Sequence, residues 1–168
     1  VQGFGRVKQN AAVASSDTLA LSGHKIGAPK GIGLLKIKED IKMSALIFGG
    51  GQQSNLRSGT ESPALIGSFA LALKLANSEQ ISFEQTTKKY RETIIKVLRG
   101  AQLTFNLQTS LEPEKSAPHV LNISFPDIDG RLLVPALNVQ GVEVSSGSAC
   151  ASGASMASPV LLASGVPK

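Results

Sequence analysis

The sequence is poor in aromatic residues and has almost no cysteine. It lacks tryptophan, has one tyrosine, and only 4% of its 168 residues are aromatic, so any core must be mainly aliphatic. Its single cysteine, Cys150, excludes an internal disulfide and fits a reducing compartment, which predicts a cytoplasmic protein. No charged segment followed by an apolar run opens the chain, so the sequence predicts no signal peptide.

Charge and hydropathy exclude two further classes of partner. Lysine and arginine total 17 against 12 acidic residues, but these cations are scattered and not interleaved with aromatic residues. This pattern argues against a nucleic-acid surface and favours, weakly, an anionic ligand. The uncharged stretch 144–167 is filled with serine, glycine and proline, which predicts a loop with a short helix and no membrane span. We also predict no metal site.

Periodicity predicts a mixed α/β chain. Short apolar runs bounded by turn residues predict strands at 18–22, 32–38, 45–48, 103–107, 120–125 and 142–145. Helical patterns predict a buried helix over 62–77, an amphipathic helix over 83–100 and a third helix over 130–139. The amphipathic helix is expected to bury Phe83, Thr87, Tyr90, Ile94 and Leu98. Asp129 is expected to cap the third helix, which Pro135 should kink or shorten.

The most informative motif is Ser22-Gly23-His24-Lys25, which closes an apolar strand and leads into a glycine-rich loop. A partly desolvated lysine there could condense with an aldehyde. Ser22 and His24 can donate hydrogen bonds to a phosphate, and the loop offers backbone N–H groups. The alternative is an ordinary basic surface loop.

Two other segments carry candidate functional groups. The loop 49–61 is rich in glycine, and it could wrap an anion with backbone amides, the Arg57 guanidinium and the Thr60 hydroxyl. The alternative there is an inter-element turn. Cys150 lies among small residues in Ser145-Ser146-Gly147-Ser148-Ala149-Cys150, which favours a mobile thiol that reaches a site elsewhere, although a lone cysteine is often inert packing. His119 begins a predicted strand and is expected to bond to backbone groups, with no part in the chemistry.

Together the motifs SGHK…PKGIG, GGGQ…LRSGTE and SSGSACASG resemble the C-terminal part of a group I, NifS/IscS-like cysteine desulfurase of the class V aminotransferase family. The resemblance implies an α/β fold of the type I pyridoxal-phosphate transferases. It divides the chain into residues 1–77, part of the large cofactor-binding domain, and residues 78–168, a small domain with the cysteine loop. Val1 is not an initiator methionine, which fits a chain truncated from a longer protein.

The resemblance also implies a role for each matching residue. Lys25 would form the imine with pyridoxal 5'-phosphate, Ser22 and His24 would bind its phosphate, and Gln2 would bond its phenolic oxygen. Thr60 would reach the phosphate in a partner subunit, which implies a homodimer with shared sites. Cys150 would be the catalytic thiol, and either His24 or the substrate amine could accept its proton. Ala28 stands where this family usually has glycine, which would be unfavourable if the position requires a positive φ.

The implied reaction converts L-cysteine to L-alanine and leaves a persulfide on Cys150 for a sulfur-acceptor or iron–sulfur scaffold protein. Lys25 would shuttle the α-proton. Two alternatives stay open: an inactive remnant or binding fragment of such an enzyme, and a different enzyme of the same fold such as a selenocysteine lyase. A nucleic-acid-binding protein is the most distant alternative.

Overall fold

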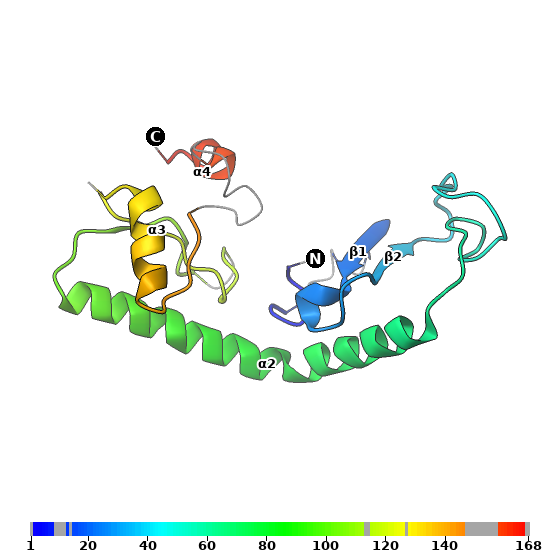
Figure 1. The fold of residues 1–168 in the computed structure, drawn as a ribbon, viewed down its shortest axis with the longest axis horizontal. Coiled ribbons are helices and arrows are strands. Elements are labelled where there is room, and N and C mark those ends of the chain that lie inside the picture. The colour runs from blue at the N-terminus through cyan, green and yellow to red at the C-terminus, as the bar shows by residue number, and fades with distance from the viewer. Residues whose placement is uncertain are drawn as a thin grey trace. The chain divides into compact units, whose positions relative to one another are not determined.

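The computed structural model describes residues 2–8, 13, 15–112, 115–126, 128–146 and 158–166 (Figure 1). The chain forms two compact units, one of residues 1–91 with 117–119 and one of residues 92–116 with 120–168. Their extents differ from the predicted domains 1–77 and 78–168, and the domain division stays a prediction. Each unit is described below by itself.

The first unit is built on an antiparallel hairpin. Strand β1, Thr18–Ser22, pairs with β2, Gly33–Ile37, in a register that places Thr18 opposite Ile37 and Ser22 opposite Gly33. The strand predicted at 18–22 is confirmed, and the one predicted at 32–38 is confirmed within one residue at each end. A short 3-10 helix, η1 (Gly23–Ile26), follows β1 directly and begins the connection to β2.

Helix α2, Pro63–Gly100, is one continuous element of 38 residues, where the sequence predicts two helices. The predicted start and end are confirmed. Pro63 suits the first turn because its missing N–H would have no intrahelical partner, and the Ser62 carbonyl accepts from Ile66 N at 3.0 Å. The predicted gap between the two helices, residues 78–82, is helical in the structure because Ser78, Glu79 and Gln80 are all compatible with a helix interior and no glycine or proline interrupts the pattern.

The buried face of α2 differs from the predicted one. Tyr90 and Ile94 are 62% and 46% exposed, whereas the neighbouring Arg91 and Ile95 are 5% and 4% exposed. The buried face is therefore formed by residues spaced four apart: Phe83, Thr87, Arg91 and Ile95. Arg91 can occupy a buried position because the stem of its side chain is aliphatic. In the first half of the helix only Phe69 and Ala72 are buried, so the expectation of a buried helix over 62–77 is met on one stripe alone.

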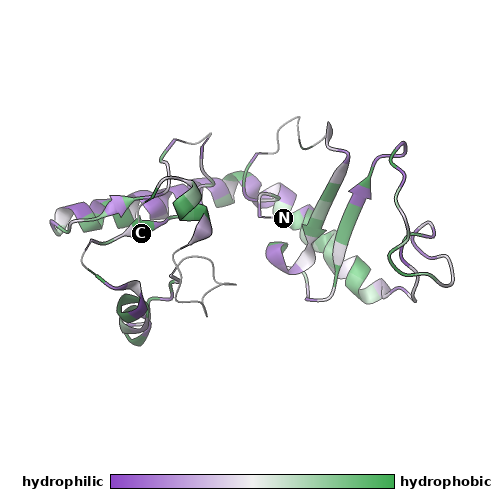
Figure 2. Ribbon diagram, turned by 90° about the horizontal axis from the view of Figure 1, so that it is seen from above, coloured by the Kyte–Doolittle hydropathy of each residue, from purple (hydrophilic) through white to green (hydrophobic). Residues whose placement is uncertain are grey.

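The core of the first unit lies between the hairpin connection and α2. Ala28, Phe69 and Ala72 are buried together, and four partly buried aliphatic residues pack against them: Leu21, Ile26, Ile32 and Leu73. Figure 2 shows hydrophobic residues on both strands and along α2. Several of these are exposed in this chain, for example Leu71 at 57% and Leu35 at 52%.

No helix in the described ranges combines the length and apolar character needed to cross a membrane.

The segment between β2 and α2 is irregular. The predicted strand at 45–48 is wrong, since only an isolated parallel bridge joins Ile47 to Arg57. Three consecutive residues, Gln53, Ser54 and Asn55, have φ of 52°, 56° and 63°, a left-handed turn that no glycine relieves. Residues 47 and 57 run in the same direction where they pair, so the segment between them forms a loop and no hairpin.

The second unit contains short elements. Strands β3 (Asn106–Leu107) and β4 (Ile123–Ser124) pair antiparallel, and both are shorter than the predicted 103–107 and 120–125. Helix α3, Gly130–Val139, matches its predicted bounds, and Asp129 caps it by accepting from Arg131 N at 2.9 Å. Pro135 lies inside α3 without shortening it. Residues 142–145 form no strand, contrary to prediction, and the predicted short helix near the end is α4, Pro159–Ala163.

Candidate functional site around Lys25

The site is centred on the turn that carries Lys25. Strand β1 ends at Ser22, whose φ of −115° and ψ of 121° are still extended, and η1 begins at the next residue. Gly27 closes η1 with φ +90° and donates its N–H to the Gly23 carbonyl, which also accepts from Ala28 N at 3.0 Å. Glycine is favoured at this position because its left-handed backbone conformation is strained for residues that carry a Cβ. Lys25 is thus held in a short, tightly bonded turn at the end of a strand.

Gly23 is required by close packing across the hairpin connection. A Cβ at this position would lie 2.8 Å from Ile32 Cγ2 and 2.9 Å from the Ile32 carbonyl oxygen, and Gly23 N donates to that same carbonyl at 2.9 Å. Ala28, by contrast, does not have a positive φ, and its methyl group is buried against Phe69 and Ala72. The anticipated strain from alanine at this position is therefore absent.

The structure brings Ser22, His24 and Lys25 together on β1 and η1. The Ser22 hydroxyl and His24 Nδ1 lie 3.0 Å apart and form a hydrogen bond. With Nδ1 engaged, Nε2 is the ring nitrogen left for an anion. His24 is exposed and Lys25 is half-buried, and no ion pair in the described part of the chain involves the Lys25 amine. A hydroxyl, an imidazole and an amine therefore share one turn.

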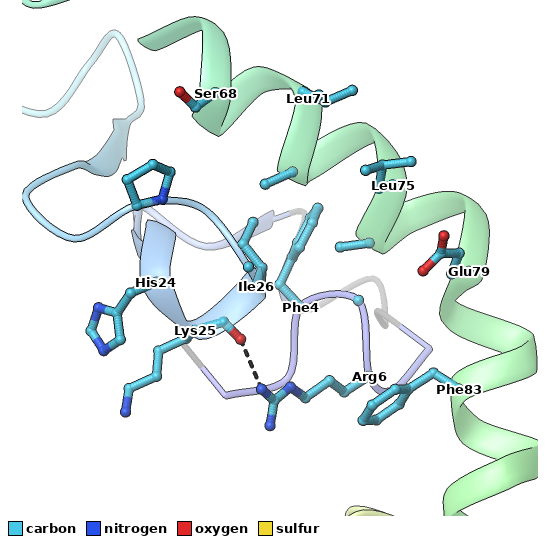
Figure 3. A pocket seen from close by; sticks show the side chains of 15 residues that line it. Phe4, Arg6, His24, Lys25, Ile26, Ser68, Leu71, Leu75, Glu79 and Phe83 are labelled. Carbon is cyan, nitrogen blue, oxygen red and sulfur yellow. Dashed lines mark hydrogen bonds between the residues drawn. The ribbon is translucent and has the colours of Figure 1, made fainter. Parts of the chain in front are cut away.

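An open pocket of about 510 Å³ lies between η1 and α2 (Figure 3). His24, Lys25 and Arg6 line it together with apolar residues of α2, among them Leu71 and Leu75. In Figure 3 the His24 and Lys25 side chains extend away from α2, while the Lys25 carbonyl oxygen faces Arg6. The lysine thus presents its amine on one side of the turn and its backbone on the other.

Arg6 is a site neighbour that sequence reasoning missed. Arg6 Nη2 donates to the Lys25 carbonyl oxygen at 2.8 Å, and its guanidinium carbon lies 5.7 Å from the centroid of the Phe83 ring. The only signal in the sequence was the alternation Gly3-Phe4-Gly5 ahead of Arg6, which is typical of a tight turn. The contact spans 19 positions, and neither periodicity nor a motif predicts such a pairing.

His119 packs against Phe83, the ring that Arg6 also contacts. Its ring centroid is 5.8 Å from that of Phe83, with an interplanar angle of 59°. Burial, and secondarily the positive charge of Arg6, lower the pKa of His119 below its usual 6.5. Its Nδ1 is buried and has no hydrogen-bond partner within the described residues. The sequence predicts that His119 begins a strand and bonds to backbone groups, but β4 begins only at Ile123 and Nδ1 makes no such bond within the described residues.

The loop 49–61 folds mainly upon itself. Arg57 Nη1 donates to the Ser58 carbonyl at 3.1 Å, Gly59 N donates to Gln52 Oε1 at 3.1 Å, and Gln53 Nε2 bonds to Glu61. Thr60 is exposed, and in the described ranges no hydrogen bond joins it to Ser22, His24 or Lys25. The loop is therefore an ordered element, with its Thr60 hydroxyl open to solvent.

Two other predicted site residues are Gln2, which the structure describes, and Cys150, which it does not. Gln2 is exposed, just before the turn in which Arg6 N and Val7 N both donate to the Gly3 carbonyl. Cys150, with the cysteine loop 147–157, lies outside the described residues. Its convergence with Lys25 stays a prediction.

A lysine turn at the end of a strand, with a serine and a histidine beside the amine and an α/β chain behind it, is the arrangement expected of a pyridoxal-phosphate transferase. The chain belongs to the aminotransferase class-V family, whose model matches residues 1–165. The predicted family and its fold class are confirmed.

Particular relatives agree with this assignment. A protein of Bacillus subtilis named putative cysteine desulfurase IscS 1 is 38% identical over 164 residues, which cover 97% of this chain and 42% of that protein. A solved structure of a NifS-like protein superimposes with a TM-score of 0.85 at 32% identity, covering 100% of this chain and 42% of the other. SspA in complex with cysteine gives a TM-score of 0.69 at 26% identity, over 99% of this chain and 44% of that one. The chain thus spans less than half the length of these relatives.

Proposed function

We propose that this chain works as part of a pyridoxal-phosphate-dependent cysteine desulfurase, which converts L-cysteine to L-alanine and holds the sulfur as a persulfide on Cys150. The observation that carries the proposal is the intact lysine turn, Ser22 to Gly27, in a chain that is similar along 97% of its length to a protein named as such a desulfurase. The solved SspA structure contains cysteine, which supports the choice of substrate.

The residues of the turn fit the cofactor. An amine on Lys25 is the group that condenses with an aldehyde, and the Ser22 hydroxyl with the outward Nε2 of His24 suits phosphate oxygens. Gln2 would contact the phenolic oxygen, and Thr60 would serve the phosphate bound in a second subunit. When bound, pyridoxal phosphate supplies an electron-withdrawing ring that stabilises negative charge on the substrate carbon.

The chain's own groups supply proton transfer and the nucleophile. Lys25, once free as an amine, would move the α-proton, and either His24 or the substrate amine would accept the proton of the Cys150 thiol. The Cys150 thiolate attacks the sulfur of the substrate, so that an S–S bond forms while the C–S bond breaks. The bonding electrons stay with the carbon fragment, which takes up a proton and leaves as alanine.

We infer three further properties of the working enzyme. It is a homodimer with shared sites, which is supported by a Thr60 hydroxyl that is exposed and unbonded to the Lys25 turn of its own chain. Its persulfide passes to a sulfur-acceptor protein, for iron–sulfur clusters or for thiolation of tRNA and cofactors. It works in the cytoplasm, where a single unpaired thiol stays reduced.

The first test is the binding of pyridoxal phosphate to the full chain. We expect a visible absorption band that survives gel filtration and is lost in Lys25→Ala, whereas Lys30→Ala, an exposed lysine of the same loop, keeps it. Borohydride reduction followed by peptide mass spectrometry should place the adduct on Lys25. No band in the unmodified chain, or a band that K25A retains, contradicts the proposed role.

The second test is sulfur chemistry. With L-cysteine and a thiol reductant we expect sulfide and alanine in equal amounts, and Cys150→Ser should abolish sulfide release while it keeps the cofactor band. Cys150 is the only cysteine, so thiol labelling before and after substrate reports the persulfide directly. Cofactor binding without sulfide release would assign the chain to the binding-fragment alternative.

A further inference from the structure

The backbone at Lys25 has a partner outside its own turn. In a helix the last carbonyl groups find no intrahelical N–H, and η1 ends one residue after Lys25. Arg6 Nη2 supplies the missing donor to the Lys25 carbonyl oxygen at 2.8 Å (Figure 3). This is a charge-assisted hydrogen bond, which is stronger than a neutral one. It acts on the peptide unit that also carries the Lys25 side chain.

The other end of Arg6 is fixed against α2. Its guanidinium carbon lies 5.7 Å from the centroid of the half-buried Phe83 ring, within the range of a cation–π contact. The His119 ring packs against the same Phe83 ring, with 5.8 Å between the two ring centroids. Arg6 therefore connects the lysine turn to the long helix through one hydrogen bond and one ring contact.

The position of Arg6 is set by a close approach between the backbone at Gly5 and Ala76 of α2. Gly5 has φ +68°, and a Cβ on it would lie 2.6 Å from Ala76 Cβ and 3.1 Å from the Ala76 carbonyl oxygen. Only glycine permits this approach, which brings the turn onto α2 two helical turns before Phe83. The position of Arg6 therefore follows from the packing of Gly5 against Ala76.

We propose that Arg6 is a positioning residue for Lys25: it holds the main chain of η1 so that the lysine side chain extends away from α2 and its amine is available to condense with a phosphorylated aldehyde. This inference rests on the proposed function, because it concerns the same lysine. It assigns to Arg6 no contact with substrate or cofactor. Its effect is to limit the orientations that the Lys25 amine can take, which favours condensation at this lysine over the exposed Lys30.

The test uses the full chain, pyridoxal phosphate as the probe, and three variants. Arg6→Met keeps the aliphatic stem without a donor, Arg6→Lys restores a charged donor, and Arg99→Met removes an exposed arginine of α2 as the control. We measure cofactor affinity by absorption titration and, after borohydride reduction, the ratio of adduct on Lys25 to adduct on Lys30. A purely structural contribution would change thermal stability without changing this ratio.

We expect R6M to bind about tenfold more weakly, the effect of losing one charge-assisted hydrogen bond, and to lose its preference for Lys25. R6K should recover most of both, and R99M should match the unmodified chain. Unaltered affinity and ratio in R6M, or an R6K no better than R6M, overturns the proposal while the proposed function stands. Absence of cofactor binding in the unmodified chain instead refutes the proposed function. Should R6M fail to fold, Phe83→Leu decides: we expect a smaller loss in both measurements, and no change overturns the proposal.

Discussion

Gly5 and Ala76 approach so closely that a methyl group on Gly5 would lie 2.6 Å from the Ala76 Cβ. This contact brings the turn formed by residues 3–7 against α2 and explains how an arginine far from Lys25 in the sequence reaches its carbonyl group. The lysine turn is therefore positioned from two sides: by its own hairpin and by a glycine-dependent contact with the long helix.

Gly5→Ala should lower the free energy of unfolding by about 2 kcal/mol, because alanine combines a positive φ with a steric overlap. Chemical denaturation of the full chain measures the change. Gly67→Ala is the matched control, since a Cβ there meets nothing within 4 Å and the helix interior favours alanine, so stability should rise by about 0.5–1 kcal/mol. Equal effects of the two variants would show that the contact with Ala76 does not restrain the turn.

Ser54→Gly should raise the free energy of unfolding by up to about 1 kcal/mol. Ser54 has φ 56° between two other left-handed residues, and a non-glycine residue there carries a cost of about that size. Ser78→Gly, in the middle of α2, is the control and should destabilise by about 0.5 kcal/mol. Denaturant unfolding measures the free energy of unfolding of both variants. A loss of stability in S54G would show that the positive φ of Ser54 does not destabilise the folded chain.

The sequence predicted the local elements well where a local signal existed. Strand β1, the start of α2 at Pro63, its end at Gly100 and the whole of α3 follow from capping residues and periodicity at those positions. The Lys25 turn was found for the same reason, because strand, glycine and lysine are adjacent in the chain. Such features require only interactions between near neighbours.

What the sequence did not predict depends on distant contacts. The burial of Arg91 in place of Tyr90 is decided by what packs against α2, since both residues satisfy a helical pattern. The apolar run 45–48 forms no strand because, within the described residues, it pairs with another segment only at the isolated bridge between Ile47 and Arg57, and the run itself does not signal whether a partner strand exists. The Arg6 contact with Lys25 likewise required the folded chain.

The acid stability of α3 should depend on Asp129. Hydrogen bonds from the Arg131 side chain and backbone lower the pKa of Asp129 to about 2, from 3.8 in an unfolded chain. A lowered carboxyl pKa stabilises the folded state above pH 3.8, and that contribution is lost as the pH falls through about 2. Asp129→Asn still caps the helix but does not titrate, so its stability relative to the unmodified chain should improve as the pH is lowered through this window.

Two further variants complete that measurement. Asp129→Ala should destabilise at every pH, because it removes the cap as well as the charge. Asp40→Asn, an exposed carboxyl outside any described ion pair, should leave the difference between acid and neutral pH as it is in the unmodified chain. Denaturation followed by circular dichroism between pH 2 and pH 5 gives the comparison. A parallel response of D129N and the unmodified chain would rule out the Asp129 carboxylate as the source.

The last prediction concerns His119, whose pKa is lowered below 6.5 by burial and by the charge of Arg6. Below pH 6.5 the unfolded chain takes up a proton that the folded chain resists, so the free energy of unfolding must fall as the pH drops from 6.5 towards the folded pKa. His119→Gln should remove this loss, whereas His24→Gln, which changes the other, exposed histidine, should keep it. Urea unfolding on either side of pH 6.5 provides the measurement, and Arg6→Met should make the slope shallower, since it removes the neighbouring positive charge. If H119Q loses stability with the same slope as the unmodified chain, the protonation of His119 is not the cause of this pH dependence.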